Sequence, residues 1–369
     1  MSEYQYYGWQ AIDHPLNECE LEEVSQLSSH MDEVTSMRAS VTYQWGNFKH
    51  KPAQILLKYF DVFIYDSNFG YRCVIFRIPK KLLDPNTIAP YIDDENISLE
   101  THGAYHILEL SCNDEDNDLE YIDSDRMLDR LSTLRELIMR GDYRALYLTW
   151  LRSVVDEEYN EEFEEPPVPV GLNKLDTGLR ALIEFFGLDA HLVSAAADST
   201  AQIESTPEAD LTAAIPNLSR EEIESHLADI VRGEAGAVTA LKKHLAQLQK
   251  KSAQKNSAPA RTLGELIRLR DKIEKQEKSK AKKEAERKRI QKLEKLSGRQ
   301  EEAWGQVASL CQEKRAKAYD EAVQLLGDLR ELGEYKNQKF EFQQRFANIL
   351  EAYGKSVAFK ERLRRARLM

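Results

Sequence analysis

The chain has 369 residues, of which 42% are hydrophobic, 9% aromatic and 31% charged. This length is typical of two or three domains with sizeable cores, whereas 16 glycines and 11 prolines are too few for a collagen-like or linker-dominated chain. No run approaches the ~18 apolar residues of a membrane span, and residues 1–4 begin no secretory signal. We therefore expect a cytoplasmic protein with no membrane partner.

The net charge of −12 conceals two halves of opposite sign. Residues 1–240 contain 45 acidic and 18 basic side chains, whereas residues 241–369 contain 18 acidic and 33 basic ones. Such an asymmetry affects partners and long-range attraction rather than the fold. The basic part can attract nucleic acid or another acidic surface, or it can be drawn to the acidic half of the same chain.

Strand and helix patterns alternate over residues 1–113, which predicts an α+β sheet domain. Asn17 can cap one short helix, and Pro52 suits the first turn of another. Glycines at 70 and 103 fall where two hairpins are expected to turn. Alternating or aromatic runs predict strands at 4–12, 41–45, 61–65, 71–78, 97–100 and 104–110.

The next part of the chain is predicted to be helical. Residues 113–125 are acidic and are interpreted as an exposed connector. A helical region is expected over 126–250, with a proline-rich break near 166–169. Within it, Ser219 and Glu222 form a capping-box pattern at the start of one helix.

Residues 261–297 predict one long charged helix, because they contain no proline and consist mainly of Lys, Arg, Glu, Gln and Ala. Such a helix would be about 54 Å long. Apolar residues stand near both ends, but Ala281 and Ala285 alone occupy the centre, which favours a solvated helix over a coiled-coil seam. Residues 299–369 predict a C-terminal helical bundle that begins with a tetratricopeptide-like hairpin, although one hairpin is not a repeat array.

No cofactor is expected from the cysteines or from the acidic connector. The four cysteines form no close pair, so we interpret them as reduced, buried or inert thiols rather than as a zinc site. Asp114, Asp116 and Asp118 share the spacing of a calcium loop, but Leu119 stands where that loop requires glycine. A solvated acidic linker is the favoured interpretation.

Evidence for catalysis is equally slight. His102 and His106, with Glu109 nearby, could ligate a metal ion, but ordinary surface histidines are favoured because the local pattern is strand and turn. The sequence contains no GxSxG, phosphate-binding loop or dinucleotide-binding pattern. The dense aromatic residues between 4 and 69 are interpreted as sheet packing rather than as a base-stacking surface.

One stretch offers a candidate contact surface, the basic helix at 261–299. Its cations could neutralise phosphates and so bind nucleic acid in a salt-dependent way. Glutamates lie between them and lower the net field, so a spacer or a contact with a protein partner is favoured. The candidate contact residues are Lys278, Lys280, Lys282, Lys283, Arg287, Lys288 and Arg289.

Several segments together resemble a family of uncharacterised bacterial proteins. The resemblance covers nearly the whole chain and implies a bacterial cytoplasmic protein, loosely associated with neighbours that carry SWIM-type zinc fingers. It implies no catalytic residues, and the zinc-finger cysteines are absent from this chain. The segments are residues 6–13, 45–49, 140–148, 165–169, 319–323 and 359–363.

The sequence as a whole predicts a non-enzymatic adaptor that bridges protein partners through an N-terminal module and a helical C-terminal module. Two alternatives remain open. The first is a nucleic-acid-associated protein that binds through residues 261–299, and the second is an enzyme of unknown class. The identity of the partners and the oligomeric state are left open.

Overall fold

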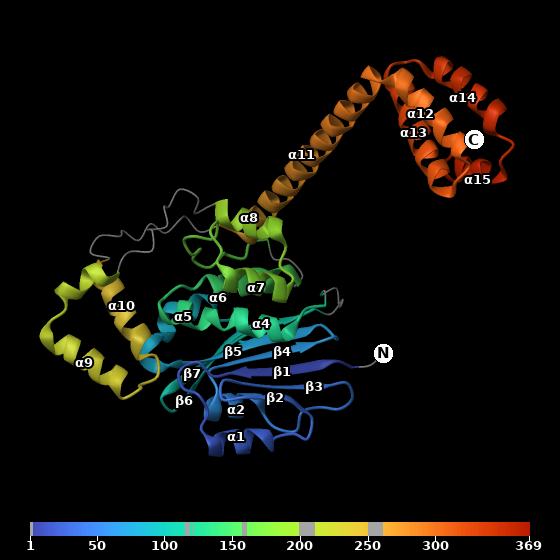
Figure 1. The fold of residues 1–369 in the computed structure, drawn as a ribbon. Coiled ribbons are helices and arrows are strands. Elements are labelled where there is room, and N and C mark those ends of the chain that lie inside the picture. The colour runs from blue at the N-terminus through green and yellow to red at the C-terminus, as the bar shows by residue number, and fades with distance from the viewer. Residues whose placement is uncertain (1–2, 115–118, 120, 157–160, 199–210, 250–260) are drawn as a thin grey trace. The chain divides into compact units, whose positions relative to one another are not determined.

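The computed structural model describes residues 3–114, 119, 121–156, 161–198, 211–249 and 261–369. The chain divides into two compact units, Met1–Glu274 and Lys275–Met369. The first unit contains a sheet with helices, and the second is helical (Figure 1). This confirms the predicted order of an α+β region followed by helices.

The first unit is built on one antiparallel sheet of seven strands in the order β2-β3-β1-β4-β5-β7-β6. The β4–β5 and β6–β7 hairpins turn at Gly70 and Gly103, which have positive φ angles of 92° and 55° and so adopt a conformation that suits glycine. The strands are β1 (Gln5–Gln10), β2 (Met31–Val34), β3 (Arg38–Tyr43), β4 (Val62–Ser67), β5 (Tyr71–Pro79), β6 (Ile97–His102) and β7 (Tyr105–Asn113).

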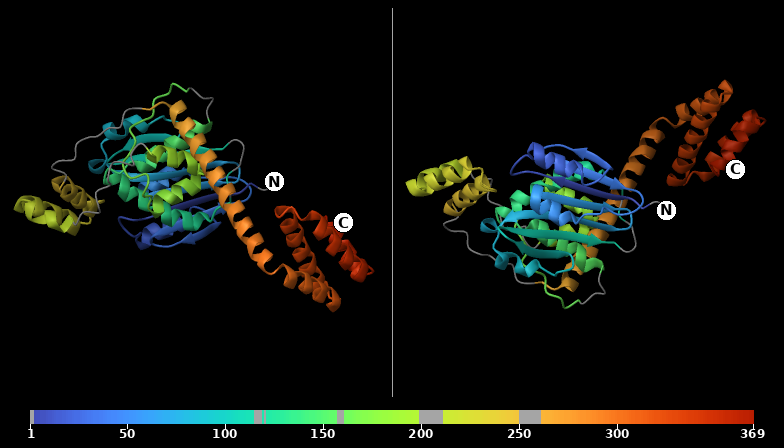
Figure 2. Two further views of the ribbon diagram at one scale, coloured as in Figure 1. Left: turned by 90° about the horizontal axis from the view of Figure 1, so that it is seen from above. Right: turned by 90° about the horizontal axis from the view of Figure 1, so that it is seen from below.

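Side chains alternate between the two faces of the sheet. One face holds a cluster of aromatic rings, among them Tyr7, Trp9, Phe48 and Phe63. Helices α1 (Glu18–Ser25) and α2 (Pro52–Tyr59) lie on this face, as Figure 2 shows from below. The interpretation of the aromatic residues between 4 and 69 as packing is therefore confirmed for most of them. The exceptions are Trp45, which is 71% exposed beyond the end of β3, and Phe69, which is 49% exposed between β4 and β5.

The other face is covered by helices. One continuous apolar cluster joins residues of the sheet, such as Ile64 and Leu108, to residues of these helices, such as Leu131 and Phe185. The layer lies above the sheet in Figure 1 and consists of α4 (Ser124–Leu131), α5 (Thr133–Met139), α6 (Arg144–Asp156) and α7 (Thr177–Phe186), with α8 (Ala190–Asp198) in contact with α6. Short helices η1 (Lys80–Leu82), α3 (Pro85–Ile88) and η2 (Ala89–Tyr91) connect β5 to β6.

The acidic stretch at 113–125 is exposed at several of its described residues, as predicted, but differs from the prediction at Asp114. Asp114 is buried, accepts a hydrogen bond from the Leu119 amide and lies 3.7 Å from Arg152. Asp123 caps α4 through the Arg126 amide. An exposed connector is therefore wrong for Asp114, whereas Asp123 is exposed as predicted. The calcium-loop candidates Asp116 and Asp118 lie outside the described residues.

A helical hairpin completes the first unit. Its elements are η3 (Leu211–Asn217), α9 (Arg220–Val231) and α10 (Ala237–Gln249). The capping box predicted at Ser219 and Glu222 is confirmed, with both of its reciprocal hydrogen bonds present. Helix α10 contacts α5, where Lys242 pairs with Glu136 at 2.8 Å.

The predicted long helix is confirmed as α11 (Leu263–Gly298), a continuous helix of 36 residues. Four helices follow it: α12 (Gln300–Glu313), α13 (Ala316–Tyr335), α14 (Lys339–Tyr353) and α15 (Val357–Arg365). They enclose an apolar cluster that includes Trp304, Leu326 and Phe359. Among the described residues, no helix combines the length and apolar character needed to cross a membrane.

Candidate functional site

The seven predicted contact residues all lie on α11, and all are exposed. Successive residues of an α-helix are rotated by about 100°, so their positions around the axis follow from their numbers. This places them in groups on opposite sides of the helix, Lys278, Lys282 and Arg289 on one and Lys280, Lys283 and Arg287 on the other, with Lys288 between them. A phosphate backbone that followed one side would therefore meet only part of the set.

The last turns of α11 use their charges within the second unit. Arg289 lies 3.3 Å from Glu286 and also donates a hydrogen bond to Glu331 of α13. The bond to Glu331, assisted by Glu286, raises the pKa of Arg289 above its ordinary value. One turn further, Lys292 pairs with Asp328 at 2.6 Å. The structure thus places Arg289 in a contact between α11 and α13.

The start of α11 is held by a buried ionic contact in the first unit. The side chain of Glu165 is 1% exposed, and its two carboxylate oxygens accept hydrogen bonds from Arg261 at 2.7 and 2.8 Å. Tyr147 of α6 donates a further hydrogen bond to the same carboxylate. Burial and the charge of Glu165 raise the pKa of Tyr147, so this phenol stays protonated.

The first backbone amides of α11 are also satisfied locally. Thr262 and Glu265 form a reciprocal capping box. The carbonyl oxygens of Phe163 and Glu161 accept from the amides of Leu263 and Gly264 at 2.8 and 3.1 Å. The helix therefore begins at a fixed position against residues 161–165.

Apolar contacts anchor both ends of α11. Leu263 and Leu266 are buried in the sheet–helix core of the first unit. Leu293 and Leu296 are buried in the core of the second unit. From Lys275 to Arg289 every residue except Glu284 is exposed, which confirms the predicted solvated centre.

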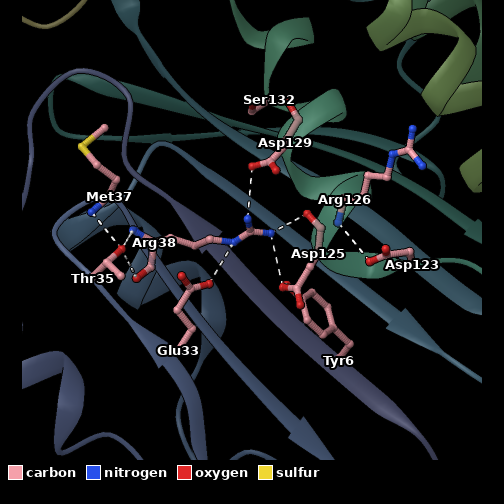
Figure 3. Close-up of polar contacts among 10 residues, drawn as sticks. All are labelled: Tyr6, Glu33, Thr35, Met37, Arg38, Asp123, Asp125, Arg126, Asp129 and Ser132. Atoms are coloured by element: carbon pink, nitrogen blue, oxygen red, sulfur yellow. Dashed lines mark hydrogen bonds and ion pairs between the residues drawn. The ribbon is translucent and has the colours of Figure 1, made fainter.

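A polar cluster at the sheet edge was not predicted from sequence. The guanidinium of Arg38 on β3 lies 3.2 Å from Asp129, 3.3 Å from Asp125 and 3.5 Å from Glu33. It also donates to the backbone carbonyl of Asp125. Tyr6 of β1 donates to the Asp125 carboxylate at 2.6 Å, so three strands and α4 meet at one cation (Figure 3).

Gly8 makes this arrangement of Tyr6 sterically possible. Gly8 and Tyr6 lie on the same face of β1 because they are two residues apart. A Cβ atom on Gly8 would stand 2.7 Å from the Cε1 and hydroxyl oxygen of Tyr6, closer than such atoms approach. The missing side chain therefore leaves the space through which the Tyr6 ring reaches Asp125.

The Arg38 cluster has the chemistry of a clamp. Burial and the hydrogen bond to Asp125 raise the pKa of Tyr6, so its hydroxyl remains a donor. The guanidinium can only donate hydrogen bonds, and three carboxylates surround it. The cluster consequently joins α4 to the sheet edge, and the raised pKa of Tyr6 disfavours ionisation of its hydroxyl beside Asp125.

Two further arginines are buried beneath the helical layer. Arg135 of α5 binds Asp13 at 2.7 Å and lies 3.2 Å from Asp61. Arg72 of β5 binds Asp66 at 2.7 Å, and the same carboxylate accepts from Ser124. Both guanidinium groups are paired with buried carboxylates, so they hold the helical layer and the sheet together. No residue spacing in the sequence predicted them, because Asp13 is 122 residues from Arg135, and Arg72 meets Asp66 only across the β4–β5 hairpin.

The histidines singled out in the sequence do not come together. In the β6–β7 ladder His102 stands opposite Tyr105 and His106 opposite Thr101, so the two histidines occupy adjacent rows and point to opposite faces. His102 is a surface histidine and pairs with Glu100 at 2.9 Å, whereas His106 is buried, so its interpretation as a surface histidine is wrong. Among the residues that the structure describes, no group of three or more His, Cys, Asp or Glu side chains is arranged to hold a metal ion.

An apolar cavity of about 540 Å³ lies beside α7 and α8. Its walls include Leu172, Ile183 and Val193, and its polar side chains are Asn173, Ser194 and Asp198. Because these lining residues include a single titratable group, the cavity offers no acid–base pair. It supplies space for an apolar group rather than a catalytic arrangement.

Comparison with known proteins found no matching family model, no matching curated protein and no matching solved structure.

Proposed function

We propose that the protein is a non-enzymatic adaptor, in which the unit ending at Glu274 and the unit beginning at Lys275 engage different protein partners. The observation that carries the proposal is α11, whose two ends belong to separate apolar cores while its centre is exposed and charged. A long helix that buries nothing at its centre is suited to connecting two binding modules.

The charge pattern of α11 favours this role over nucleic-acid binding. Between Lys275 and Arg289 there are eight basic and three acidic side chains, and Arg287 is paired with Glu284 at 3.0 Å. The cations stand on opposite sides of the helix, so one nucleic acid would contact few of them at once. Each phosphate that a protein neutralises adds to its electrostatic affinity for nucleic acid. Because few cations of α11 reach one strand together, the expected affinity is small.

Exposed apolar side chains supply candidate contact points on each unit. Trp45 of the first unit is 71% exposed, and Phe340 of the second unit is 73% exposed. Large aromatic side chains are enriched among the residues that dominate the affinity of protein interfaces. We assign Trp45 to the first binding surface and Phe340 to the second.

Affinity capture with the full-length chain tests the bridging role. The variants are Trp45→Glu and Phe340→Glu, and the matched controls are Gln44→Glu and Gln343→Glu, which add the same charge at exposed neighbouring positions. We expect each aromatic variant to lose one set of partners and keep the other, while the controls keep both. Loss of the same partners by both variants, or no partner above background with the native chain, would contradict an adaptor.

The second candidate is nucleic-acid binding through residues 261–299, and the observation in its favour is that all seven candidate cations are exposed. A gel-shift series across salt concentrations separates it from the adaptor. The full-length chain is compared with a variant in which Lys282, Lys283, Arg287 and Lys288 are changed to Glu. The adaptor hypothesis predicts no salt-sensitive binding of nucleic acid. Nucleic-acid binding that is lost on charge reversal would support the alternative.

A further inference from the structure

Two histidines of the helical hairpin face each other. His226 Nε2 on α9 lies 3.0 Å from His244 Nδ1 on α10, and the ring planes are inclined at 54°. Both side chains are part-buried and reachable from solvent. The apolar cluster of this hairpin has only three buried members, Ala214, Leu218 and Leu245, and α9 itself buries none of its described residues. The histidine pair is thus a principal polar contact between two helices that share little apolar surface.

The spacing of the two nitrogens suits a shared metal ion. Imidazole nitrogens bind Zn²⁺ at roughly 2.0–2.1 Å, so two of them at a tetrahedral angle stand about 3.3 Å apart. At the right angle of a square-planar Cu²⁺ site they stand about 2.9 Å apart. The observed separation of 3.0 Å lies between these values, so an ion could bind both nitrogens once the two rings turn from facing each other to facing the ion.

Glu222 is placed to orient one of the two rings. Its carboxylate lies 3.6 Å from Nε2 of His244, on the side of the ring away from His226. A proton on Nε2 is favoured beside a carboxylate, which leaves Nδ1 with a free lone pair. Metal-binding histidines commonly donate a hydrogen bond from their second nitrogen to a carboxylate. Glu222, at 3.6 Å, stands just beyond that distance and would reach it after a small movement of the His244 ring. Glu222 also caps α9 by accepting from the Ser219 amide at 2.7 Å, so its position is fixed by the fold.

We propose that His226 and His244 form a site for a divalent transition-metal ion of the Cu²⁺ or Zn²⁺ class, with Glu222 as a positioning residue. On binding, the proton on Nε2 of His226 moves to Nδ1 of the same ring through exchange with water, so that both facing nitrogens offer a lone pair and each imidazole stays neutral. No third His, Cys, Asp or Glu among the described residues joins the pair. As far as the described residues go, the remaining coordination positions are left to water or to another ligand.

Copper titration of the full-length, untagged protein tests the site. Electron paramagnetic resonance should show one Cu²⁺ equivalent bound with two nitrogen ligands, and calorimetry should give the matching stoichiometry. His226→Asn and His244→Asn should each weaken binding at least tenfold and remove one nitrogen from the spectrum. Glu222→Gln should weaken binding by about 10- to 100-fold, as expected of a group that orients a ligand.

The matched control is His102→Asn, because His102 is an exposed histidine that also touches a carboxylate, Glu100. It should bind Cu²⁺ like the native chain. Far-UV circular dichroism establishes that each variant retains its helices. A native chain without a two-nitrogen copper signal, or unchanged binding in both folded histidine variants, would overturn the proposal.

Discussion

Arg135 is a charged side chain sealed inside the first unit, with 1% of its side chain exposed. Its guanidinium binds both carboxylate oxygens of Asp13 at 2.7 and 3.1 Å, and its Nε donates to the carbonyl of Arg77 at 2.7 Å. Removing one partner of a buried ion pair leaves the other charged and without compensation. This residue therefore tests how strongly the helical layer depends on buried charge.

We predict that Arg135→Met lowers the free energy of unfolding of the first unit by about 3–5 kcal/mol, because Asp13 and Asp61 would lose their buried partner. The matched control is Arg130→Met, which removes an exposed pair with Glu184 and should cost no more than about 1 kcal/mol. Denaturant unfolding measures both. Equal losses of unfolding free energy in the two variants would show that removing the buried Arg135 is no more destabilising than removing the exposed ion pair.

The acid limit of stability should depend on Asp61. Its carboxylate accepts from the Ile12 and Asp13 amides at 2.7 and 2.9 Å. Burial works to raise its pKa, but Arg135 and Arg77 outweigh this and hold the pKa below the ordinary value. A folded pKa below the unfolded one gives stability that is present above the unfolded pKa and is lost as pH falls through the folded pKa.

We therefore predict that the free energy of unfolding declines as the pH falls below about 4, the ordinary range of a carboxyl group. Carbon-detected NMR titration of the folded protein should place the Asp61 carboxyl below its ordinary pKa of 3.8. An Asp61 carboxyl that titrates at or above that value would contradict the proposed role of the two arginines.

At this scale the sequence was informative about packing and uninformative about charge. The aromatic pattern around Trp9 correctly predicted a core, because alternation reports which side of a strand is buried. The clamp at Arg38 was missed, because its carboxylates at Asp125 and Asp129 are about ninety residues away in the chain. His226 and His244 were also missed, because they lie on two different helices and meet only through the way these helices pack.

At the scale of elements, the contact of α4 with the sheet depends on Gly8 in β1. We predict that Gly8→Ala lowers the stability of the first unit by about 1–3 kcal/mol, the usual cost of forcing an extra carbon into a packed site. The new Cβ would displace the Tyr6 ring and weaken its hydrogen bond to Asp125. Thermal unfolding with near-UV circular dichroism measures both changes.

The control is Gly305→Ala in α12, where nothing lies within 4 Å of the added Cβ. Alanine is the better helix former there, so this variant should gain roughly 0.5–1 kcal/mol in the second unit. A neutral or stabilising Gly8→Ala would show that the Tyr6 ring has room to move and that the clamp is not sterically fixed.

The boundaries of elements followed local signals where such signals exist. The caps at Asn17 and Ser219 were predicted correctly, because a capping box is defined by four neighbouring residues. Strand β2 was missed, because it has four residues and pairs with β3 alone at the sheet edge. Trp45 was wrongly included in the neighbouring strand, which ends at Tyr43.

At the scale of the whole molecule, the first turns of α11 belong to the core of the first unit. Arg261 binds the buried carboxylate of Glu165, and Leu263 and Leu266 lie in the sheet–helix core. We predict that a chain ending at residue 274 unfolds at a higher temperature than one ending at residue 255. The shorter chain leaves Glu165 buried without its cation, a cost of about 3–5 kcal/mol. Equal melting temperatures in calorimetry would contradict the anchoring role of Arg261.

The adaptor depends on α11 being one continuous helix through its exposed centre. This is tested most directly by pulsed electron paramagnetic resonance on the full-length chain with spin labels at Lys272→Cys and Lys288→Cys. The exposed Cys19 is changed to Ser, and the other three cysteines are buried. Sixteen residues of unbroken helix correspond to about 24 Å along the axis, so we predict a single narrow distance distribution that fits this rise. A broad distribution, or one centred well below that of an intact helix, would contradict a continuous connecting helix.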